Sequence, residues 1–184
     1  MTREMAQKIS LFCNVRPEAV IEERDVAFSI YEVPVDLCRL GLDRLVTKHL
    51  GLPSEEGTDL TDWNEMLDNL RGLDKTCEIA VVGKYIELHD AYKSIYESLS
   101  HAGYANRCKV KIRKISAEDI LTKGTELLAG VDGVLIPGGF GERGIEGKIQ
   151  SIRWARENGI PFFGICLGMQ CAVIEYARNA LKLE

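Results

Sequence analysis

Cys166 is the residue whose type and setting point most directly to chemistry. It lies between two glycines in the segment IPFFGICLGMQ (residues 160–170), where a strand-like apolar run gives way to a helix-like pattern. This arrangement predicts a nucleophile elbow, a sharp strand-to-helix turn that exposes a reactive side chain. The amides at the start of the helix would stabilise a thiolate and help to hold an oxyanion. The alternative is that Cys166 is a small buried apolar residue.

A second glycine-rich segment, LIPGGFG (residues 135–141), also follows a strand-like run. Its three glycines leave backbone amides uncovered, and such amides can point at a developing negative charge, as those of an oxyanion hole do. Taken alone, the glycine doublet is better explained as a flexible turn. Because the elbow follows one strand–helix unit later, both turns would emerge on one rim of a parallel sheet, which favours the oxyanion hypothesis.

The elements that position these turns follow from alternating patterns in the second half of the chain. Strands are expected at residues 78–82, 109–115, 133–136 and 161–165, and helices at 90–102, 117–129, 146–157 and 167–183. The alternation predicts an α/β fold, with an open parallel sheet covered by helices on both faces. Active sites in such sheets lie at the carboxyl ends of the strands, where both glycine-rich turns fall.

The first half of the chain has a different pattern. A strand is expected at residues 8–15, helical segments at 17–21, 30–49 and 60–70, and a polar loop at 51–57. This half has little apolar mass for a core of its own, so we expect it to be part of a larger domain. The predicted division is residues 1–71, a linker at 72–77, and a second domain at 78–184.

The composition argues against several classes of protein. The net charge is −5, whereas nucleic-acid-binding surfaces are usually basic. No apolar run reaches the roughly 18 residues of a membrane span, and no signal peptide is recognisable. The six cysteines show no CxxC spacing, so we expect no metal site and no disulfide framework. A reducing, cytoplasmic setting is the simplest explanation.

Several motifs resemble a known family. PGGFGxRGxEGK followed by GICLGMQ resembles the signature of class I, triad-type glutamine amidotransferases. The stretches KISLFCNV, DV, SIY, VP and VVGKYIELHDAYKSI resemble the CTP synthase family, in a bacterial style. The likeness runs from about residue 8 to residue 179. It implies an incomplete class I amidotransferase sheet, preceded by a mostly helical remnant of a P-loop-type synthetase domain.

The resemblance also implies an activity. Members of the family aminate UTP to CTP, using ATP and ammonia drawn from glutamine. The expected small-molecule partners are glutamine, UTP, ATP and GTP, the last as an allosteric activator. Mg²⁺ accompanies ATP in the full-length enzyme, no cofactor is bound covalently, and the full-length form is expected to be a homotetramer.

Site residues follow from the matching positions. Cys166 would be the glutaminase nucleophile, with Gly139 and Leu167 as the oxyanion residues. The glutamine-binding residues would be Gly139, Leu167, Gly168, Met169 and Gln170. The segment 140–148, with Arg143 and Gly144, resembles a lid that closes over the glutaminase site and responds to GTP. The alternative for Arg143 is a solvated surface charge.

On the synthetase side, the resemblance implies that Lys8 meets the pyrimidine nucleotide and that Asp25 and Val26 line the ATP adenine. From the residues alone, Lys8 is an ordinary charge beside a strand. The sequence DVAFSIY (residues 25–31) has one residue more than the usual DVxSIY, which weakens the expected adenine contact.

A cysteine glutaminase also needs a histidine base oriented by a carboxylate. In the family that the chain resembles, both residues follow the nucleophile by well over a hundred residues, as an HxE pair. The histidines of this chain, His49, His89 and His101, all precede Cys166, and no GxxxxGK[ST] phosphate loop is present. His89 is interpreted as a loop residue. We therefore expect an internal fragment that does not turn over alone. The alternatives are another Cys-elbow α/β hydrolase or peptidase, or a non-catalytic assembly module.

Overall fold

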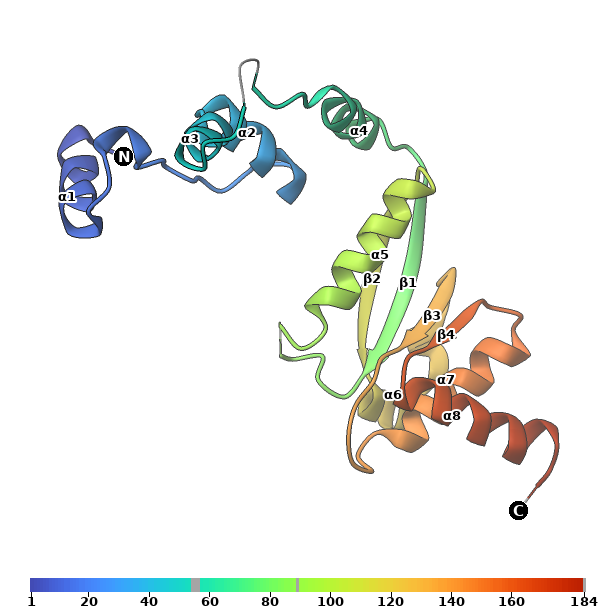
Figure 1. Ribbon diagram of the computed structural model, residues 1–184. Coiled ribbons are helices and arrows are strands. Elements are labelled where there is room, and N and C mark those ends of the chain that lie inside the picture. The colour runs from blue at the N-terminus through green and yellow to red at the C-terminus, as the bar shows by residue number, and fades with distance from the viewer. Residues whose placement is uncertain (54–56, 89, 184) are drawn as a thin grey trace. The chain divides into compact units, whose positions relative to one another are not determined.

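The computed structural model describes residues 1–53, 57–88 and 90–183 of the chain. They form two compact units, Met1–Gly72 and Leu73–Glu184 (Figure 1). His89 and part of the expected loop at 51–57 lie outside the described residues. Both glycine-rich turns belong to the second unit.

The second unit is built on a four-stranded parallel sheet. Its strands are β1 (Thr76–Gly83), β2 (Lys109–Ser116), β3 (Gly133–Ile136) and β4 (Phe162–Gly164). They lie in the order β2-β1-β3-β4, and every neighbouring pair is parallel (Figure 1). The open parallel sheet predicted from the alternating pattern is confirmed.

Four helices follow the strands: α5 (Lys93–Ala105), α6 (Ala117–Lys123), α7 (Ile145–Glu157) and α8 (Leu167–Glu175). The β1–β2 connection crosses the sheet in the direction opposite to the β2–β3 and β3–β4 connections. Right-handed crossovers therefore place α5 on one face and α6 and α7 on the other. Helix α8 packs against α7 and β4.

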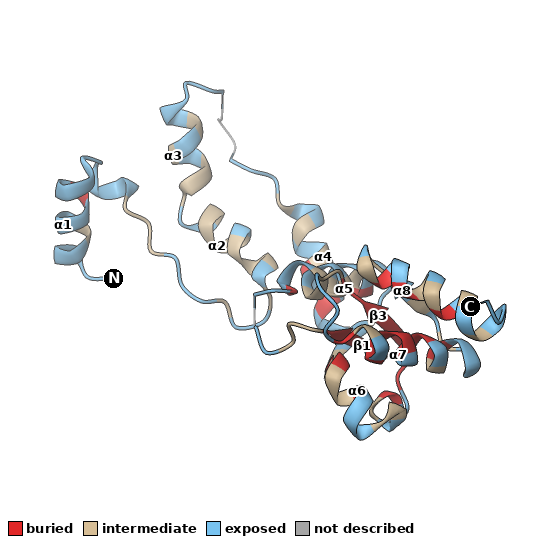
Figure 2. Ribbon diagram, turned by 90° about the horizontal axis from the view of Figure 1, so that it is seen from below, coloured by how far each residue is buried: buried red, intermediate tan, exposed pale blue. Residues whose placement is uncertain are grey.

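The core of this unit lies between the sheet and helices α6, α7 and α8. Alternate strand residues face it because successive side chains of a strand point to opposite faces. The fully or nearly fully buried residues in the sheet (red in Figure 2) meet apolar side chains of α6 and α7. The cluster includes Ala80, Val82, Val134, Ile136, Ile120, Ile149 and Ile152.

Two expected helices of this unit are shorter than the sequence suggested. Gly124, at φ 88°, ends α6, and the chain continues as a 3₁₀ turn at Thr125–Leu128. A residue at positive φ cannot continue a right-handed helix, so the expected helix over 117–129 is broken. Helix α8 ends at Glu175, and a π-type turn follows at Tyr176–Ala180.

The first unit is mainly helical. Its elements are α1 (Arg3–Cys13), α2 (Val33–Arg39), α3 (Leu42–His49), α4 (Thr61–Arg71) and 3₁₀ turns at Pro17–Ala19 and Ile30–Glu32. The expected helix over 30–49 is divided at Gly41, which has φ 84°. The helix expected at 60–70 is present as α4, and the carboxylate of Asp59 accepts the Thr61 N–H at 2.9 Å.

The strand predicted at residues 8–15 is wrong, because this segment lies mostly within α1. Residues 1–53 and 57–72 form no strand with which it could pair. An unpaired strand leaves its backbone groups unsatisfied, whereas a helix satisfies its own. Thr2 Oγ1 accepts the Met5 N–H at 3.2 Å, and Asn14 ends the helix in the left-handed conformation at φ 52°.

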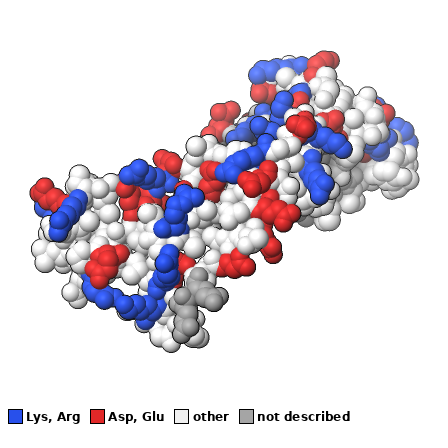
Figure 3. All heavy atoms as spheres, turned by 90° about the horizontal axis from the view of Figure 1, so that it is seen from above, with Lys and Arg blue, Asp and Glu red and all other residues white. Residues whose placement is uncertain are grey.

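Basic and acidic side chains lie interspersed on the surface in Figure 3. Arg113 of β2 forms an ion pair that extends into a hydrogen-bond network. Its guanidinium donates to the Glu78 carboxylate at 2.7 and 3.0 Å and to the carbonyls of Leu127 and Ala129 at 3.0 and 2.8 Å. The hydrogen bonds from Arg113 hold the pKa of Glu78 below its usual value. Arg113 therefore joins β1 and β2 to the segment that leads into β3.

Replacing Arg113 by methionine is expected to lower the free energy of unfolding by about 1–2 kcal/mol, because several hydrogen bonds to a partly buried charge are lost. Urea denaturation would measure the change. The part of the difference that comes from the Glu78 ion pair should be present above the pKa of an unfolded glutamate and be lost as the pH falls through the lowered pKa of Glu78. The part that comes from the hydrogen bonds to the Leu127 and Ala129 carbonyls should remain. Arg153→Met is a matched control, because Arg153 pairs only with Glu157 one helical turn away, at 2.8 Å on an exposed face, among the contacts described for it. An equal effect of the two substitutions would contradict the prediction.

Candidate active site

Cys166 occupies a strained turn between β4 and α8. Its backbone angles are φ 52° and ψ −110°, and its side chain is exposed. A residue other than glycine rarely adopts a positive φ, and such strain is concentrated at functional sites. The chain therefore makes a sharp strand-to-helix turn that presents the thiol to solvent, as an elbow requires. The role of Cys166 in catalysis stays a prediction.

The two glycines that flank Cys166 are required by close packing. A Cβ atom on Gly168 would lie 2.1 Å from the carbonyl oxygen of Ile136, and one on Gly164 would lie 2.5 Å from the carbonyl carbon of Gly168. Both contacts are with backbone atoms, which cannot swing aside. The turn can therefore form against β3 only when both positions lack a side chain.

The second glycine-rich segment lies directly beside this turn. A Cβ built on Gly138 would be 3.5 Å from the Cys166 Cβ, and one on Gly139 would be 3.7 Å from Leu167 Cδ2. The reason is topological, since β3 and β4 are neighbours and both segments leave the same edge of the sheet. The structure thus brings together the thiol and the glycine loop that sequence reasoning placed on one rim.

Lys84, at the end of β1, holds the same loop in place. Its ammonium donates a hydrogen bond to the Phe140 carbonyl at 2.7 Å. Gly141 then turns the chain at φ 73°, and the Phe140 side chain is 82% exposed. The beginning of the predicted lid therefore has an anchored backbone and an aromatic side chain open to solvent.

The remaining lid residues lie at the start of α7. Arg143 forms an ion pair with Glu118 of α6 at 2.7 Å, and both side chains are about half exposed. Gly144 precedes the helix at φ 81°. Arg143 is thus an exposed charge paired with a carboxylate of α6, and its role in a lid stays a prediction.

Apart from Gly139, the predicted glutamine-binding residues form the first turn of α8, which begins at Leu167. Gly168 is buried, whereas Met169 and Gln170 are exposed. The Gln170 N–H donates to the Cys166 carbonyl at 3.1 Å. The Met169 and Gln170 side chains are therefore accessible to a small molecule beside the thiol.

Sequence reasoning missed a buried pair beneath this site, Lys148 of α7 and Cys171 of α8. Both side chains are fully buried. Burial lowers the pKa of Lys148, while the Cys171 thiol raises it and Lys84 lowers it further. Burial raises the pKa of Cys171. The only signal in the sequence was that Lys148 ends the motif PGGFGERGIEGK.

The histidines described by the structure lie in helices. His49 is in α3 of the first unit, and His101 is in α5 of the second. A catalytic base for Cys166 was not identified from the sequence, and the structure assigns neither of these helical residues to the elbow.

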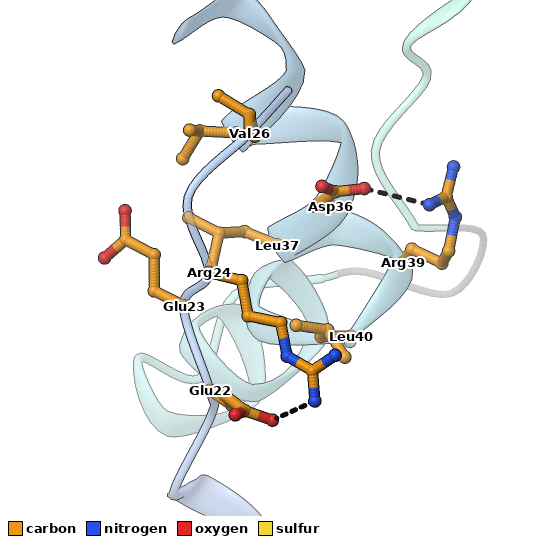
Figure 4. A pocket seen from close by; sticks show the side chains of 9 residues that line it. Glu22, Glu23, Arg24, Val26, Asp36, Leu37, Arg39 and Leu40 are labelled. Atoms are coloured by element: carbon orange, nitrogen blue, oxygen red, sulfur yellow. Dashed lines mark hydrogen bonds and ion pairs between the residues drawn. The ribbon is translucent and has the colours of Figure 1, made fainter. Parts of the chain in front are cut away.

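The first unit contains the predicted adenine-contacting residues, and two cavities adjoin them. One, with a volume of about 330 Å³, is lined by Val26 and by residues of the 22–24 segment and α2 (Figure 4). The other, of about 410 Å³, is lined by both Asp25 and Val26. Lys8 is exposed on α1 and lines neither cavity. Its contact with a nucleotide stays a prediction.

The 330 Å³ cavity has charged walls. Arg24 pairs with Glu22 and Arg39 pairs with Asp36, at 2.8 and 2.9 Å (Figure 4). These two carboxylates are thus already paired. Within residues 1–53, 57–88 and 90–183, no group of three or more His, Cys, Asp or Glu side chains is arranged to hold a metal ion.

Similarity to known proteins agrees with this geometry. Residues 87–184 match the family model described as Glutamine amidotransferase class-I. The chain belongs to the class I glutamine amidotransferase family. Residues 1–52 match the family model described as CTP synthase N-terminus.

Two curated relatives that the chain resembles over nearly its whole length are both named CTP synthase. The chain is 55% identical over 185 aligned residues to a CTP synthase of Clostridium kluyveri, a match that covers 100% of this chain and 34% of the relative. It is 57% identical over 178 residues to a CTP synthase of Pyrococcus furiosus, covering 97% of this chain and 33% of the relative. The chain therefore spans about a third of the length of the curated relatives that it matches.

A solved structure is similar in fold as well as in sequence. It is the glutaminase domain of Trypanosoma brucei CTPS with bound acivicin, with a TM-score of 0.53 and 39% identity. The likeness covers 57% of this chain and 42% of that structure. The parallel sheet and its helices are thus of the class I amidotransferase type. In the described part of the chain, no helix combines the length and apolarity needed to cross a membrane.

Proposed function

We propose that this segment supplies the glutaminase nucleophile of an enzyme that aminates UTP to CTP in pyrimidine nucleotide biosynthesis. The observation that carries the proposal is the exposed Cys166 thiol on a positive-φ turn, which lies beside the Gly138–Gly139 loop: a Cβ built on Gly138 would be 3.5 Å from the Cys166 Cβ. A peptidase-like elbow enzyme would share the turn. It would not explain why residues 1–52 match a CTP synthase model.

The chemistry follows from the arrangement of these groups. The Cys166 thiolate attacks the side-chain amide carbon of glutamine, and the carbonyl oxygen becomes an oxyanion. The amides of Gly139 and Leu167 would stabilise that charge. The intermediate collapses to a glutamyl thioester and ammonia, and water then releases glutamate. Met169 and Gln170 contact the substrate beside the thiol.

Ammonia must be protonated as it leaves, and the thiol must lose its proton, so the reaction requires a histidine base. No histidine follows Cys166 in this sequence. We therefore expect these 184 residues to react at the thiol but not to turn over glutamine by themselves.

The nucleotide half of the reaction is represented less completely. Asp25 and Val26 border a cavity whose size suits an adenine ring. The described residues do not fit the phosphates and Mg²⁺ of ATP, because the sequence has no phosphate loop and the structure no carboxylate cluster for the ion. No step is therefore assigned to ATP or Mg²⁺ on this segment. UTP as acceptor, a contact of Lys8 with it, a homotetramer and a cytoplasmic location remain part of the proposal.

The lid at 140–148 would couple GTP to the glutaminase site. The exposed Phe140 ring lies on the loop that also carries Gly139, and Lys84 anchors that loop. A ligand that moved this loop would move the oxyanion amide, which is a direct route for activation. Arg143 would have to leave Glu118 to take part.

A glutamine-analogue chloroketone tests the glutaminase assignment on this chain. It needs a thiolate and a glutamine pocket but no leaving-group protonation. We expect Cys166 to be alkylated at least about tenfold faster than other thiols, since reactive cysteines are activated by their surroundings. Excess glutamine should slow the reaction. Peptide mass spectrometry would give the rate at each cysteine.

Two thiols serve as internal controls. Cys13 is exposed but lies on α1, and Cys171 is buried. Equal rates at Cys166 and Cys13 would show that exposure alone governs labelling, and would favour a non-catalytic assembly module. Fast labelling without protection by glutamine would favour another elbow enzyme.

A further inference from the structure

Lys148 lies in a setting that lysines rarely occupy. It is the fourth residue of α7, its side chain has 0% exposure, and its Nζ atom has no hydrogen-bond partner among the described residues. A lysine is almost never fully buried unless it is paired, and an unsatisfied buried amine is costly. Such a residue requires a reason beyond packing.

The amine lies behind the candidate oxyanion loop. Its Nζ atom is 3.3 Å from the position that a Cβ on Gly139 would take, and Leu167 Cδ2 is 3.7 Å from the same point. One residue earlier in the loop, a Cβ built on Gly138 would be 3.5 Å from the Cys166 Cβ. Lys148 is therefore one backbone segment away from the thiol and the amides that would face a substrate oxyanion.

The groups around Lys148 do not neutralise it. Cys171 of α8 faces it as a buried thiol, and Lys84 at the end of β1 adds a second positive charge. Glu146, in the first turn of α7, acts on Cys171 rather than directly on the amine. Burial lowers the pKa of Lys148, and no carboxylate among the described residues is hydrogen-bonded to its amine.

We propose that Lys148 is a positioning residue for negative charge at Cys166, its buried ammonium providing positive potential behind the Gly138–Gly139 loop for the thiolate and for the oxyanion formed from it. The inference rests on the proposed glutaminase function. Because the amine is fixed and excluded from water, its field reaches the site with little screening. It acts through the loop and touches no substrate.

The proposal makes stability and reactivity change in opposite directions. Lys148→Met keeps most of the length of the side chain and removes a buried charge that has no described partner. The protein should therefore unfold at the same temperature as wild type or higher. The thiolate of Cys166 should form less readily, because the positive potential behind it is gone.

The test measures alkylation of Cys166 by iodoacetamide across pH values from about 6 to about 10, a range that spans thiol titration. In Lys148→Met, we expect the rate at pH 7 to fall by between about threefold and tenfold, the effect of one charge across a partly shielded distance. The two rates should converge at high pH, where the thiol is ionised in both proteins. Thermal unfolding is recorded on the same samples.

Lys123→Met is the matched control, since Lys123 is an exposed lysine of α6 paired with Asp119. It should leave the pH dependence unchanged. A rate in Lys148→Met that equals wild type, or that falls by the same factor at every pH, overturns the proposal whether or not the unfolding temperature changes. Iodoacetamide requires no glutamine pocket. If the iodoacetamide test contradicts the proposal while the chloroketone still labels Cys166 selectively, only the role of Lys148 is ruled out. If the chloroketone does not label Cys166 selectively in the wild-type protein, the glutaminase assignment is ruled out.

Discussion

Replacing Cys166 by alanine in a full-length CTP synthase that contains this segment is expected to abolish CTP formation from glutamine while leaving formation from free ammonia intact. The thiol is the only group at the elbow that can form a covalent bond to the glutamine carbon. Ammonia added to the medium needs no such bond. We expect glutamine-dependent activity to fall by ~1,000-fold or more, as is typical when a nucleophile is removed.

The measurement compares CTP produced with glutamine and with an ammonium salt, using Cys13→Ala as the control. Cys13 is also an exposed cysteine, but it lies on α1. That control should behave as wild type with both nitrogen donors. Loss of both activities in Cys166→Ala would show that Cys166 does not serve the glutaminase step alone. Retention of both would remove Cys166 from the mechanism.

The second large effect is expected from Gly168→Ala. The added methyl group would meet the Ile136 carbonyl oxygen at 2.1 Å, a contact between a helix and the neighbouring strand backbone. Neither partner can rotate away, so α8 would have to move from β3. We expect a loss of about 3 kcal/mol or more in unfolding free energy, at the upper end of overpacking effects. The displaced helix would also carry Cys166 away from the Gly138 loop.

Gly72→Ala provides the comparison. Gly72 has φ −90°, and a Cβ there would make only ordinary contacts, the nearest at 3.8 Å. This control should change stability little, and chemical denaturation would measure both variants. If Gly168→Ala unfolded like the control and its Cys166 were alkylated at the wild-type rate, the close approach of α8 to β3 would not be what holds the elbow.

Much of the second unit could be predicted from the sequence because its elements obey local patterns. The β3 strand, at Gly133–Ile136, coincides with the predicted one, and α7 differs from its prediction by one residue. Buried parallel strands are continuous apolar runs, and amphipathic helices repeat with their own period, so both are readable without knowledge of their partners.

The first unit was harder to predict because its pattern is ambiguous without tertiary partners. Residues 8–15 carry apolar side chains that suit either a strand or a helix. Which one forms depends on whether a neighbouring strand is present to accept backbone hydrogen bonds. In this unit the local helix of α1, ended by Asn14, satisfies them.

The order of strands and helices in the second unit, the two glycine-rich turns and the position of Cys166 in the second turn could all be derived from the sequence, because each of these is set by neighbours along the chain. The tertiary structure was needed to show that Gly168 leaves no room for a Cβ beside Ile136, that Gly138 lies near Cys166 and that Lys148 is buried near Gly139. These contacts join residues that are distant in sequence. The alternating pattern predicts that parallel strands bring their carboxyl ends to one edge, but which atoms meet there depends on how the helices pack against the sheet.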